Sequence, residues 1–244
     1  MKYQFVIGTN ATTDVSVGTI GSITTLYQVP FNFRWDIVGA GSATRTRNVL
    51  ANRFLKDNEA PYLIFIDRDM VFTPKDMQKL YKDLEDGYDL IAGCYTIKTT
   101  MRLTSGCARD GDLFLDGSIK EVKYLGTGFM GITRKLIEKM VKELALPLMH
   151  EGGGLEAYPL FEERRHEDID FGWMWLSEDY DFCHKARDVG VRSYLDTSIK
   201  IRHVGEALWR VDDTIESKHR RTLSEEAQKA ITEILKREAL PVGP

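Results

Sequence analysis

The sequence has few cysteines and little net charge. Its three cysteines, Cys94, Cys107 and Cys183, lie far apart and show no Cys-x-x-Cys spacing. Because disulfide frameworks and zinc sites need several closely patterned cysteines, we expect free thiols in a reducing compartment. The formal net charge of −4 does not suggest a general nucleic-acid binder, although a local basic patch stays open.

Long apolar runs are also absent. No stretch approaches the roughly 20 apolar residues that span a bilayer. The N-terminal apolar segment 3–8 is too short for a signal peptide and is typical of a strand that runs into a polar loop. We therefore expect no membrane span and a cytoplasmic location. Without an internal repeat or a dividing linker, the 244 residues predict one domain with a sizeable core.

Apolar runs of strand length alternate with helical patterns, which predicts βαβ units and a mostly parallel α/β sheet. The continuous apolar run 62–66 is typical of a central strand buried on both faces. A helix follows it, with Thr73 as its cap and Pro74 at its first position. The other predicted elements are strands at 3–9, 32–38, 89–93 and 127–132, helices at 44–57, 134–146, 177–190 and 222–238, one or two strands within 192–203, and hairpin or meander strands within 101–124.

Two segments carry more specific expectations. Segment 32–38 alternates Phe33, Trp35 and Ile37, which indicates a strand with one buried face. Segment 150–170 contains three consecutive glycines and many charges. We interpret it as a mobile loop, because long loops of this kind are often functional lids.

An acidic pair, Asp67 and Asp69, follows the buried strand directly. In open α/β sheets, ligands bind at the carboxyl ends of the strands. A continued strand would point both carboxylates the same way, and two such groups repel each other unless a cation lies between them. Because Mg²⁺ and Mn²⁺ bind carboxylates together with phosphate oxygens, the pair predicts a metal site. The alternative is that Asp67 caps a turn and Asp69 is solvated.

A second acidic pair, Glu178 and Asp179, follows Ser177 at the start of a predicted helix. Serine is a favoured cap, and acids in the first turn interact well with the helix dipole, so on its own this pattern favours a structural role. Arg45 and Arg47 fall in the first turns of the helix at 44–57. Arginine matches phosphate geometry, and the alternative is an exposed basic face.

Five segments, in the same order, resemble those of GT-A glycosyltransferases. YLIFIDRDMVFTPKDMQKL is similar to the strand–DxD–helix segment, ATRTRNVLANRFL to the Arg-Asn helix before it, and LIAGCYTIK to the Cys-Tyr-x-x-Lys segment after it. GTGFMGITRKLIEKM resembles the Gly-rich strand and helix behind the sugar site, and SEDYDFCHKARDVGVRSYLDTSIKIRHVG the acidic helix start and late His-x-Gly. The chain resembles a soluble, family-2-like member, and departs from the pattern in Arg68 at the middle of its DxD and in lacking Gln-x-x-Arg-Trp.

This resemblance implies a GT-A fold, which is a Rossmann-like, mostly parallel sheet flanked by helices with a small antiparallel element. It implies a nucleotide-sugar-binding half at about 1–100, an acceptor-binding half at about 101–210 and a C-terminal helix within 211–244. The implied activity is metal-dependent transfer of a sugar from a UDP- or GDP-sugar to a glycan, small-molecule or modified-nucleobase acceptor. The implied residues are Asp67, Asp69 and His203 for Mn²⁺ or Mg²⁺, Asp179 with Glu178 beside it as the general base, and Arg45, Arg47, Asn48, Asp67, Lys98 and Gly128 for the donor.

Several choices stay open from the sequence. Asp181 is an alternative base, and Trp173 and Trp175 suit either stacking on a sugar ring or core packing. A carboxylate base favours inversion at the anomeric carbon, although related folds also host retaining enzymes. The other classes are a nucleotidyltransferase, whose Gly-rich, Lys/Arg-containing loop is absent from 8–12, and a catalytically inactive carbohydrate- or protein-binding module, against which the intact acids argue. The oligomeric state also stays open.

Overall fold

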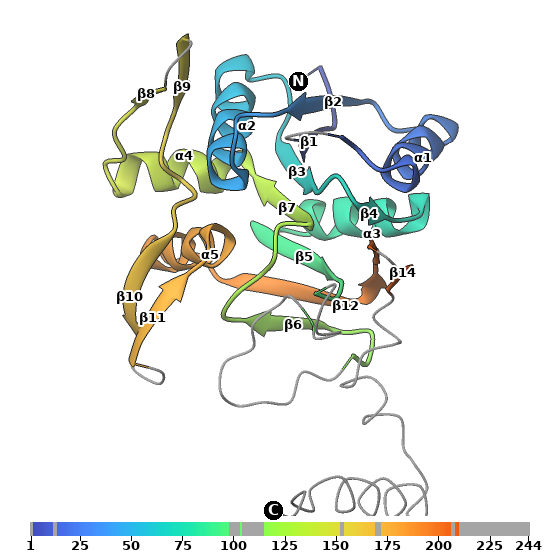
Figure 1. The fold of residues 1–244 in the computed structure, drawn as a ribbon. Coiled ribbons are helices and arrows are strands. Elements are labelled where there is room, and N and C mark those ends of the chain that lie inside the picture. Colours follow the sequence, from blue (N-terminus) through green and yellow to red (C-terminus); the bar gives the residue numbers. More distant parts are fainter. Residues whose placement is uncertain are drawn as a thin grey trace, which may run out of the picture.

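The computed structural model of the chain describes residues 2–11, 14–97, 103, 115–151, 154–168, 172–205 and 208–209. Within them, a seven-stranded sheet forms the centre of the fold (Figure 1). The order of its strands in space is β2-β1-β3-β7-β5-β12-β6. They are β1 (Phe5–Asn10), β2 (Phe33–Val38), β3 (Tyr62–Ile66), β5 (Leu90–Cys94), β6 (Ile119–Val122), β7 (Phe129–Thr133) and β12 (Ser193–Lys200).

Five of these seven strands run in one direction. β1 pairs in parallel with β2 and β3, and β12 pairs in parallel with β5. β7 is antiparallel to both β3 and β5, and β6 is antiparallel to β12. The predicted α/β class is confirmed: a mostly parallel central sheet is flanked by helices and accompanied by smaller antiparallel sheets.

Helices cover both faces of the central sheet (Figure 1). Leu63 and Phe65 of β3 join the core under one set of helices, and Ile64 and Ile66 join the core under the other. This division follows because successive side chains of a strand point to opposite faces. The first set is α2 (Ala43–Asp57), α4 (Arg134–Glu143) and α5 (Glu178–Asp188), and the second is α1 (Val17–Thr25), the short 3-10 helix η1 (Leu26–Gln28) and α3 (Pro74–Glu85).

The local signals around β3 and α3 are confirmed. The apolar run 62–66 is β3, and its last four residues are buried. Thr73 caps α3 in a capping box, in which its hydroxyl accepts from the Asp76 N–H and Asp76 accepts from the Thr73 N–H at 2.7 Å. Pro74 opens the helix, where its missing N–H costs no hydrogen bond.

Three small antiparallel sheets complete the described fold. Their strands are β4 (Met70–Val71) with β13 (Arg202–Val204) and β14 (Leu208–Trp209), β8 (Met149–Glu151) with β9 (Leu155–Ala157), and β10 (Arg164–Asp168) with β11 (Gly172–Leu176).

The prediction of a long loop over 150–170 is wrong for its described residues, because β9 and β10 lie within it. Leu160 and Phe161 are fully buried, and the Phe161 ring stacks on Phe182 of α5 with 4.5 Å between the ring centroids. This burial overrides the glycine and charge pattern, and a lid role for the segment stays a prediction.

The predictions for segments 32–38 and 101–124 differ from the structure, and several predicted residues lie outside the described part of the chain. Ile37 is 48% exposed whereas Phe33, on the same strand, is buried, so the prediction of a buried face holds for Phe33 but is wrong for Ile37. The described end of segment 101–124 forms β6, which pairs across the sheet with β12 and not within a local hairpin. Residues 98–102, 104–114 and 210–244, with Lys98, Cys107 and the predicted terminal helix, lie outside the described residues. The proposed division into two halves stays a prediction.

The described cysteines and helices bear on the predictions of free thiols and of no membrane span. Cys94 and Cys183 are buried thiols that are not joined in a disulfide, and burial raises the pKa of Cys183 to about 12. Among the helices that the structure describes, none combines the length and apolar character that a membrane crossing requires.

Asn48 ties the segment before β10 to α2. Its Nδ2 donates to the Phe161 carbonyl oxygen at 2.9 Å, and its Oδ1 accepts from the Phe161 N–H at 2.8 Å. One helical turn further on, Asn52 donates to the Glu156 carbonyl oxygen at 2.5 Å. The two amides therefore hold the backbone of β9 and of Phe161 against α2.

Replacing Asn48 with alanine should leave the N–H and the carbonyl of Phe161 without their partner. Each unsatisfied buried group costs about 1–3 kcal/mol, so we expect the free energy of unfolding to fall by at least about 2 kcal/mol in urea denaturation. Arg53→Ala, on the exposed side of the same helix, should change it by less than about 0.5 kcal/mol. An Asn48→Ala protein as stable as wild type would contradict this role.

Candidate active site

The predicted site residues gather at one edge of the central sheet. Asp67 and Asp69 follow the carboxyl end of β3, and His203 follows that of β12. Arg47 lies in α2, which begins after β2, and Gly128 precedes β7, which runs the opposite way. The carboxyl edge is where ligands bind in open α/β sheets.

Arg47 joins the two acidic segments at this edge. Its Nη2 donates to both carboxylate oxygens of Asp67, at 2.9 and 3.2 Å, and its Nη1 donates to Oε1 of Glu178. The side chain of Arg47 is only 6% exposed, against 25% for Asp67 and 15% for Glu178. Because the guanidinium group presents its donors in a planar fork, one side chain binds two carboxylates at once. The alternative of an exposed basic face is therefore wrong for Arg47.

The charge of Arg47 is stabilised by its neighbours. Burial acts to lower the pKa of Arg47, but the carboxylates of Asp67, Glu178 and Asp179 outweigh it, and the pKa lies above its ordinary value. The guanidinium therefore stays protonated at any working pH. It offsets the mutual repulsion of carboxylates that would otherwise face one another.

Asp179 lies near Arg47 and Glu178 but accepts its hydrogen bonds from other residues. The Ser177 hydroxyl and the Tyr180 N–H both donate to Oδ1 of Asp179, the second at 2.9 Å. Burial, followed by the negative charge of Glu178, raises the pKa of Asp179 to about 6. A carboxylate that titrates near neutral pH suits proton acceptance from a reacting group.

Asp181 is placed differently from Asp179. It is fully buried, accepts a hydrogen bond from Arg164, and forms an ion pair with Lys185 at 2.8 Å. Its carboxylate therefore connects α5 to β10 inside the protein. This environment favours a structural role for Asp181, the alternative base of the same helix turn.

The side chains of Asp69 and His203 lie next to each other, after the turn that follows β3. β13 pairs with β4 so that His203 lies opposite Met70. The Nε2 atom of His203 is 3.3 Å from Oδ1 of Asp69, and its Nδ1 is 2.7 Å from the Thr96 carbonyl oxygen. Because a carbonyl only accepts, Nδ1 carries a proton, which directs Nε2 toward Asp69. Sequence reasoning missed Thr96, since its contribution is a backbone carbonyl that no side-chain pattern signals.

The structure brings together two of the three predicted metal ligands. Asp69 and His203 supply an oxygen and a nitrogen, a donor set that suits Mn²⁺, and the His203–Thr96 bond is of the kind that orients metal-binding histidines. Asp67 contacts Arg47 instead. In the part of the chain that the structure describes, no three His, Cys, Asp or Glu side chains form a ready-made metal site.

The two aspartates separate because the chain turns between them. The Met70 N–H donates to the Asp67 carbonyl oxygen at 3.2 Å, so the expectation of a continued strand is wrong. Arg68, at the middle of the turn, accepts from the Ser16 N–H at 2.8 Å through its carbonyl, and its guanidinium binds Asp14 at 2.5 Å. The start of α1 therefore holds this turn from one side.

The backbone of Gly128 contacts the turn that follows β3. Its carbonyl accepts from the Asp67 N–H at 3.1 Å, and its N–H donates to the Tyr95 hydroxyl at 2.8 Å. A Cβ atom at this position would lie 2.5 Å from Cε of Met70 and 2.7 Å from Cζ of Tyr95. Glycine is therefore required for the close packing beneath Asp67, and its predicted contact with a donor stays a prediction.

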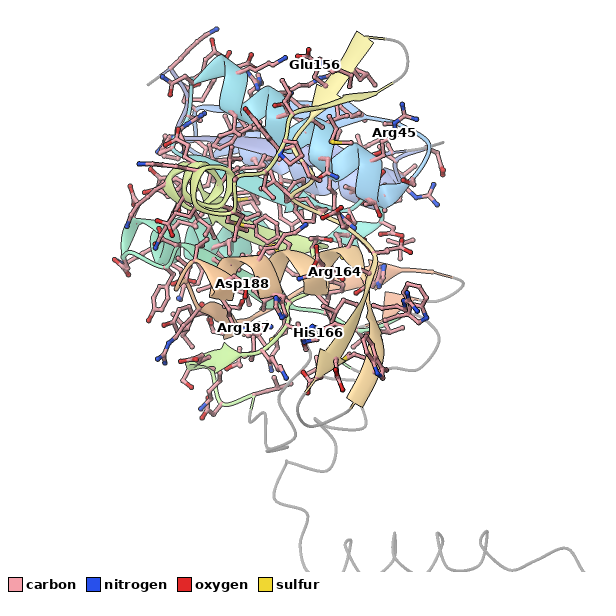
Figure 2. The ribbon with its side chains drawn as sticks, turned by 90° about the vertical axis from the view of Figure 1, so that its left-hand side faces the viewer. Arg45, Glu156, Arg164, His166, Arg187 and Asp188 are labelled. Atoms are coloured by element: carbon pink, nitrogen blue, oxygen red, sulfur yellow. The ribbon has the colours of Figure 1, made fainter. Side chains whose placement is uncertain are left out.

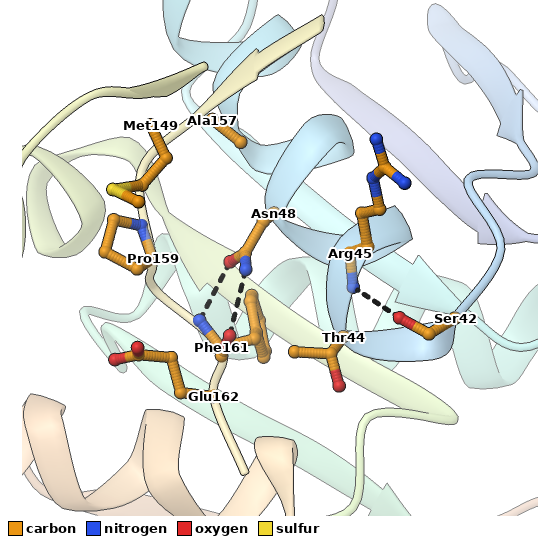
Figure 3. A pocket seen from close by; sticks show the side chains of 9 residues that line it. All are labelled: Ser42, Thr44, Arg45, Asn48, Met149, Ala157, Pro159, Phe161 and Glu162. Atoms are coloured by element: carbon orange, nitrogen blue, oxygen red, sulfur yellow. Dashed lines mark hydrogen bonds between the residues drawn. The ribbon is translucent and has the colours of Figure 1, made fainter. Parts of the chain in front are cut away.

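A pocket of about 250 Å³ lies beside the first turns of α2 (Figure 3). Its lining residues are Ser42, Thr44, Arg45, Asn48, Met149, Ala157, Pro159, Phe161 and Glu162. The Arg45 N–H binds the Ser42 hydroxyl at 3.2 Å, and Figure 3 shows the Asn48 amide turned to the Phe161 backbone. Donor contacts by Arg45 and Asn48 stay predictions, and Lys98 lies outside the described residues.

Trp173 and Trp175 lie on β11, immediately before the acidic start of α5. Each is 72% exposed. The alternative that they pack in the core is therefore wrong, and their rings are accessible to a ligand.

Replacing Arg47 with methionine should keep much of its volume but remove the charge that the three carboxylates share. Removing one partner of a buried ion pair costs about 3–5 kcal/mol, so we expect a loss of this size in the free energy of unfolding at pH 8. The Arg47 charge acts to lower the already raised pKa of Asp179, so its removal should raise that pKa further above the unfolded value of about 4. The deficit should therefore grow as pH rises and shrink toward pH 5.

Urea denaturation of wild type and Arg47→Met at the two pH values measures this difference. Arg53→Met, which removes an exposed charge from the same helix, should behave as wild type at both. A deficit in Arg47→Met that does not depend on pH would show that the carboxylates do not rely on this cation.

The fold has a counterpart among solved structures. No family model and no curated protein sequence matches the chain. Among solved structures, A197 from STIV matches 83% of this chain and 86% of its own, with a TM-score of 0.56 and 20% sequence identity. GalNAc-T7, solved with UDP, GalNAc and Mn²⁺, matches 83% of this chain and 44% of its own, with a TM-score of 0.48 and 6% identity. The likeness to A197 spans most of both chains and is a likeness of fold.

Proposed function

We propose that this chain is a metal-dependent glycosyltransferase that transfers a sugar from a UDP- or GDP-sugar to an acceptor hydroxyl. The proposal rests on one observation: Asp67 and Glu178 both accept hydrogen bonds from Arg47. It brings the DxD turn and the acidic start of α5 into one site at the carboxyl edge of the sheet. The first segment suits a diphosphate with its cation, and the second suits the proton of an acceptor.

Asp69 and His203 would hold the cation, with Asp67 as the third ligand once it leaves Arg47. The cation, when bound, offsets negative charge on the leaving diphosphate. A guanidinium released by Asp67 can bind phosphate oxygens, so Arg47 is assigned a contact with the diphosphate of the donor. Arg45, Asn48, Lys98 and Gly128 are assigned the remaining donor contacts.

Asp179 is assigned as the general base. Its Oδ1 already accepts two hydrogen bonds, so Oδ2 is the oxygen that takes the proton from the acceptor hydroxyl. As that proton leaves, the acceptor oxygen bonds to the anomeric carbon, and the bond from this carbon to the diphosphate breaks. A base on the acceptor side, facing the leaving group across the sugar, favours inversion of configuration.

The products of the reaction test the proposal against its alternatives. Incubation with Mn²⁺ and each of a set of UDP- and GDP-sugars should release UDP or GDP from at least one of them, slowly in water and faster with an acceptor. Release of pyrophosphate from nucleoside triphosphates would instead support a nucleotidyltransferase. Donor binding without any turnover would support an inactive binding module.

Asp69→Asn and His203→Ala should each weaken Mn²⁺ binding by at least about tenfold, because each removes a ligand from the site. Electron paramagnetic resonance of free Mn²⁺ measures this without any substrate, and EDTA should abolish donor turnover in wild type. Asp86→Asn, at the exposed end of α3, is the matched control and should bind Mn²⁺ as wild type does. Full donor turnover in EDTA would overturn the metal assignment.

Asp179→Asn should reduce turnover by about 10²-fold or more while donor affinity changes little, because asparagine keeps the shape but cannot accept the proton. Wild-type turnover should rise with pH through about 6, as the Asp179 carboxylate forms. Asp188→Asn, at the other end of α5, should leave turnover unchanged. Near-normal turnover in Asp179→Asn would move the base role to Glu178.

The same variant has a pH-dependent effect on stability. The raised pKa of Asp179 means that the folded state keeps a proton that the unfolded state gives up near pH 3.9. Wild type therefore loses stability as pH rises from about 4 to about 6, and the Asp179→Asn substitution removes this loss. Relative to wild type, Asp179→Asn should be more stable at pH 7.5 than at pH 4 in thermal denaturation.

A further inference from the structure

The β10–β11 hairpin turns its indole rings outward, while its inward face combines charged residues with the buried Leu176 and the half-buried Met174. Asp168 is buried and Arg164 is half-buried, whereas Trp173 and Trp175 are each 72% exposed. The outer face of a solvent-facing hairpin ordinarily carries polar residues, so the departure from the usual pattern lies in the two indoles. The exposed indoles therefore need an explanation other than folding.

The inward face anchors the hairpin firmly. Arg164 donates to the fully buried Asp181 of α5, and Asp168 accepts from Lys123. His166 packs edge-on against His184 of α5 with 4.4 Å between the ring centroids. Figure 2 shows Arg164 and His166 on the hairpin beside Arg187 and Asp188 of α5. The outward face is consequently held in position by buried charge pairs rather than by its own side chains.

The outward face presents four side chains, Arg165, Glu167, Trp173 and Trp175, here termed the Trp platform. Strand pairing places Arg165 directly opposite Trp175 and Glu167 directly opposite Trp173, and all four residues are exposed. Alternate residues of a strand lie about 6.8 Å apart. Two indoles in a row, each with a charged neighbour, therefore line one surface.

This combination suits a carbohydrate. A sugar ring has an apolar face of C–H groups and an edge of hydroxyl groups. Large, rigid aromatic side chains provide a flat apolar surface for the first, and the Arg165 donors and Glu167 acceptors can bind the second. The charges of the platform cancel, whereas a nucleic-acid strand requires an excess of positive charge over its stacking rings. The platform therefore favours a neutral glycan.

The platform leads directly into the acidic helix start. Trp175 precedes Asp179 by four residues, so their Cα atoms are at most about 14 Å apart. We propose that the Trp platform binds a neutral oligosaccharide that is the acceptor, with its terminal hydroxyl at Asp179. The acceptor role rests on the proposed glycosyltransferase function, and the binding of a glycan does not.

A glycan array of natural oligosaccharides, probed with the full chain, tests the binding. We expect wild type to bind a set of neutral glycans, and Trp173→Ala and Trp175→Ala to lose at least about tenfold in affinity for them, as aromatic residues at the centre of a contact do. Tyr27→Ala removes an equally exposed ring, 70% exposed in η1, and should bind as wild type. Thermal denaturation should show the same cooperative unfolding in all three variants as in wild type, which shows that they are folded whether or not the protein cleaves a donor.

The outcomes separate the two proposals. Glycan binding that depends on the two tryptophans in a protein that cleaves no donor would keep the platform and overturn the glycosyltransferase. Donor cleavage by a protein that binds no glycan, or binds glycans equally well in the Trp variants, would overturn the platform alone. If the Trp variants keep glycan binding but lose binding to a 20-nucleotide single-stranded DNA, the indoles belong to a nucleic-acid site. If they keep glycan binding but no longer form a dimer, the indoles contact a second copy of the chain. Either result would overturn the Trp platform as a glycan site.

Discussion

One buried cation, Arg47, holds the two acidic segments of this fold together. Its side chain is 6% exposed and binds Asp67 after β3 and Glu178 at the start of α5. Because a buried charge without a partner is costly, each of these three groups depends on the others. The consequence is geometric, since a residue of α2 and one 131 positions later in the chain must lie at the same edge of the sheet. α2, β3 and α5 are thereby fixed relative to one another around a single candidate site.

The elements that carry the site can be predicted from short stretches of sequence. A five-residue apolar run identifies β3, and Thr73 with Pro74 marks the start of α3, because burial on both faces and helix capping depend only on neighbouring residues. The alternation of strands and helices is likewise enough for the α/β class. Placement at the carboxyl edge then follows from topology for Asp67 and Asp69, whereas His203 is assigned to the site through the resemblance to GT-A glycosyltransferases.

The pairings within the site depend on contacts across the fold, and no local pattern contains them. Asp69 reaches His203 because β4 pairs with β13, and Asp67 turns to Arg47 because the chain bends after β3. Glycines and charges made segment 150–170 resemble a loop, whereas two apolar residues near its centre are buried against α5. Trp173 and Trp175 alternate in the same way whether their face is buried or exposed, so only the structure could distinguish the two.

The claim that one guanidinium couples the acidic segments is tested most directly by a double-mutant cycle on Arg47→Met and Glu178→Gln. The free energy of unfolding of wild type, both single variants and the double variant is measured at pH 8. Groups in contact show coupling energies of about 0.5–3 kcal/mol, and independent sites are additive within about 0.3–0.5 kcal/mol. The account predicts that Glu178→Gln is less damaging once Arg47 is gone, with a coupling of about 1 kcal/mol or more. Additive effects would show that Arg47 does not join the two segments.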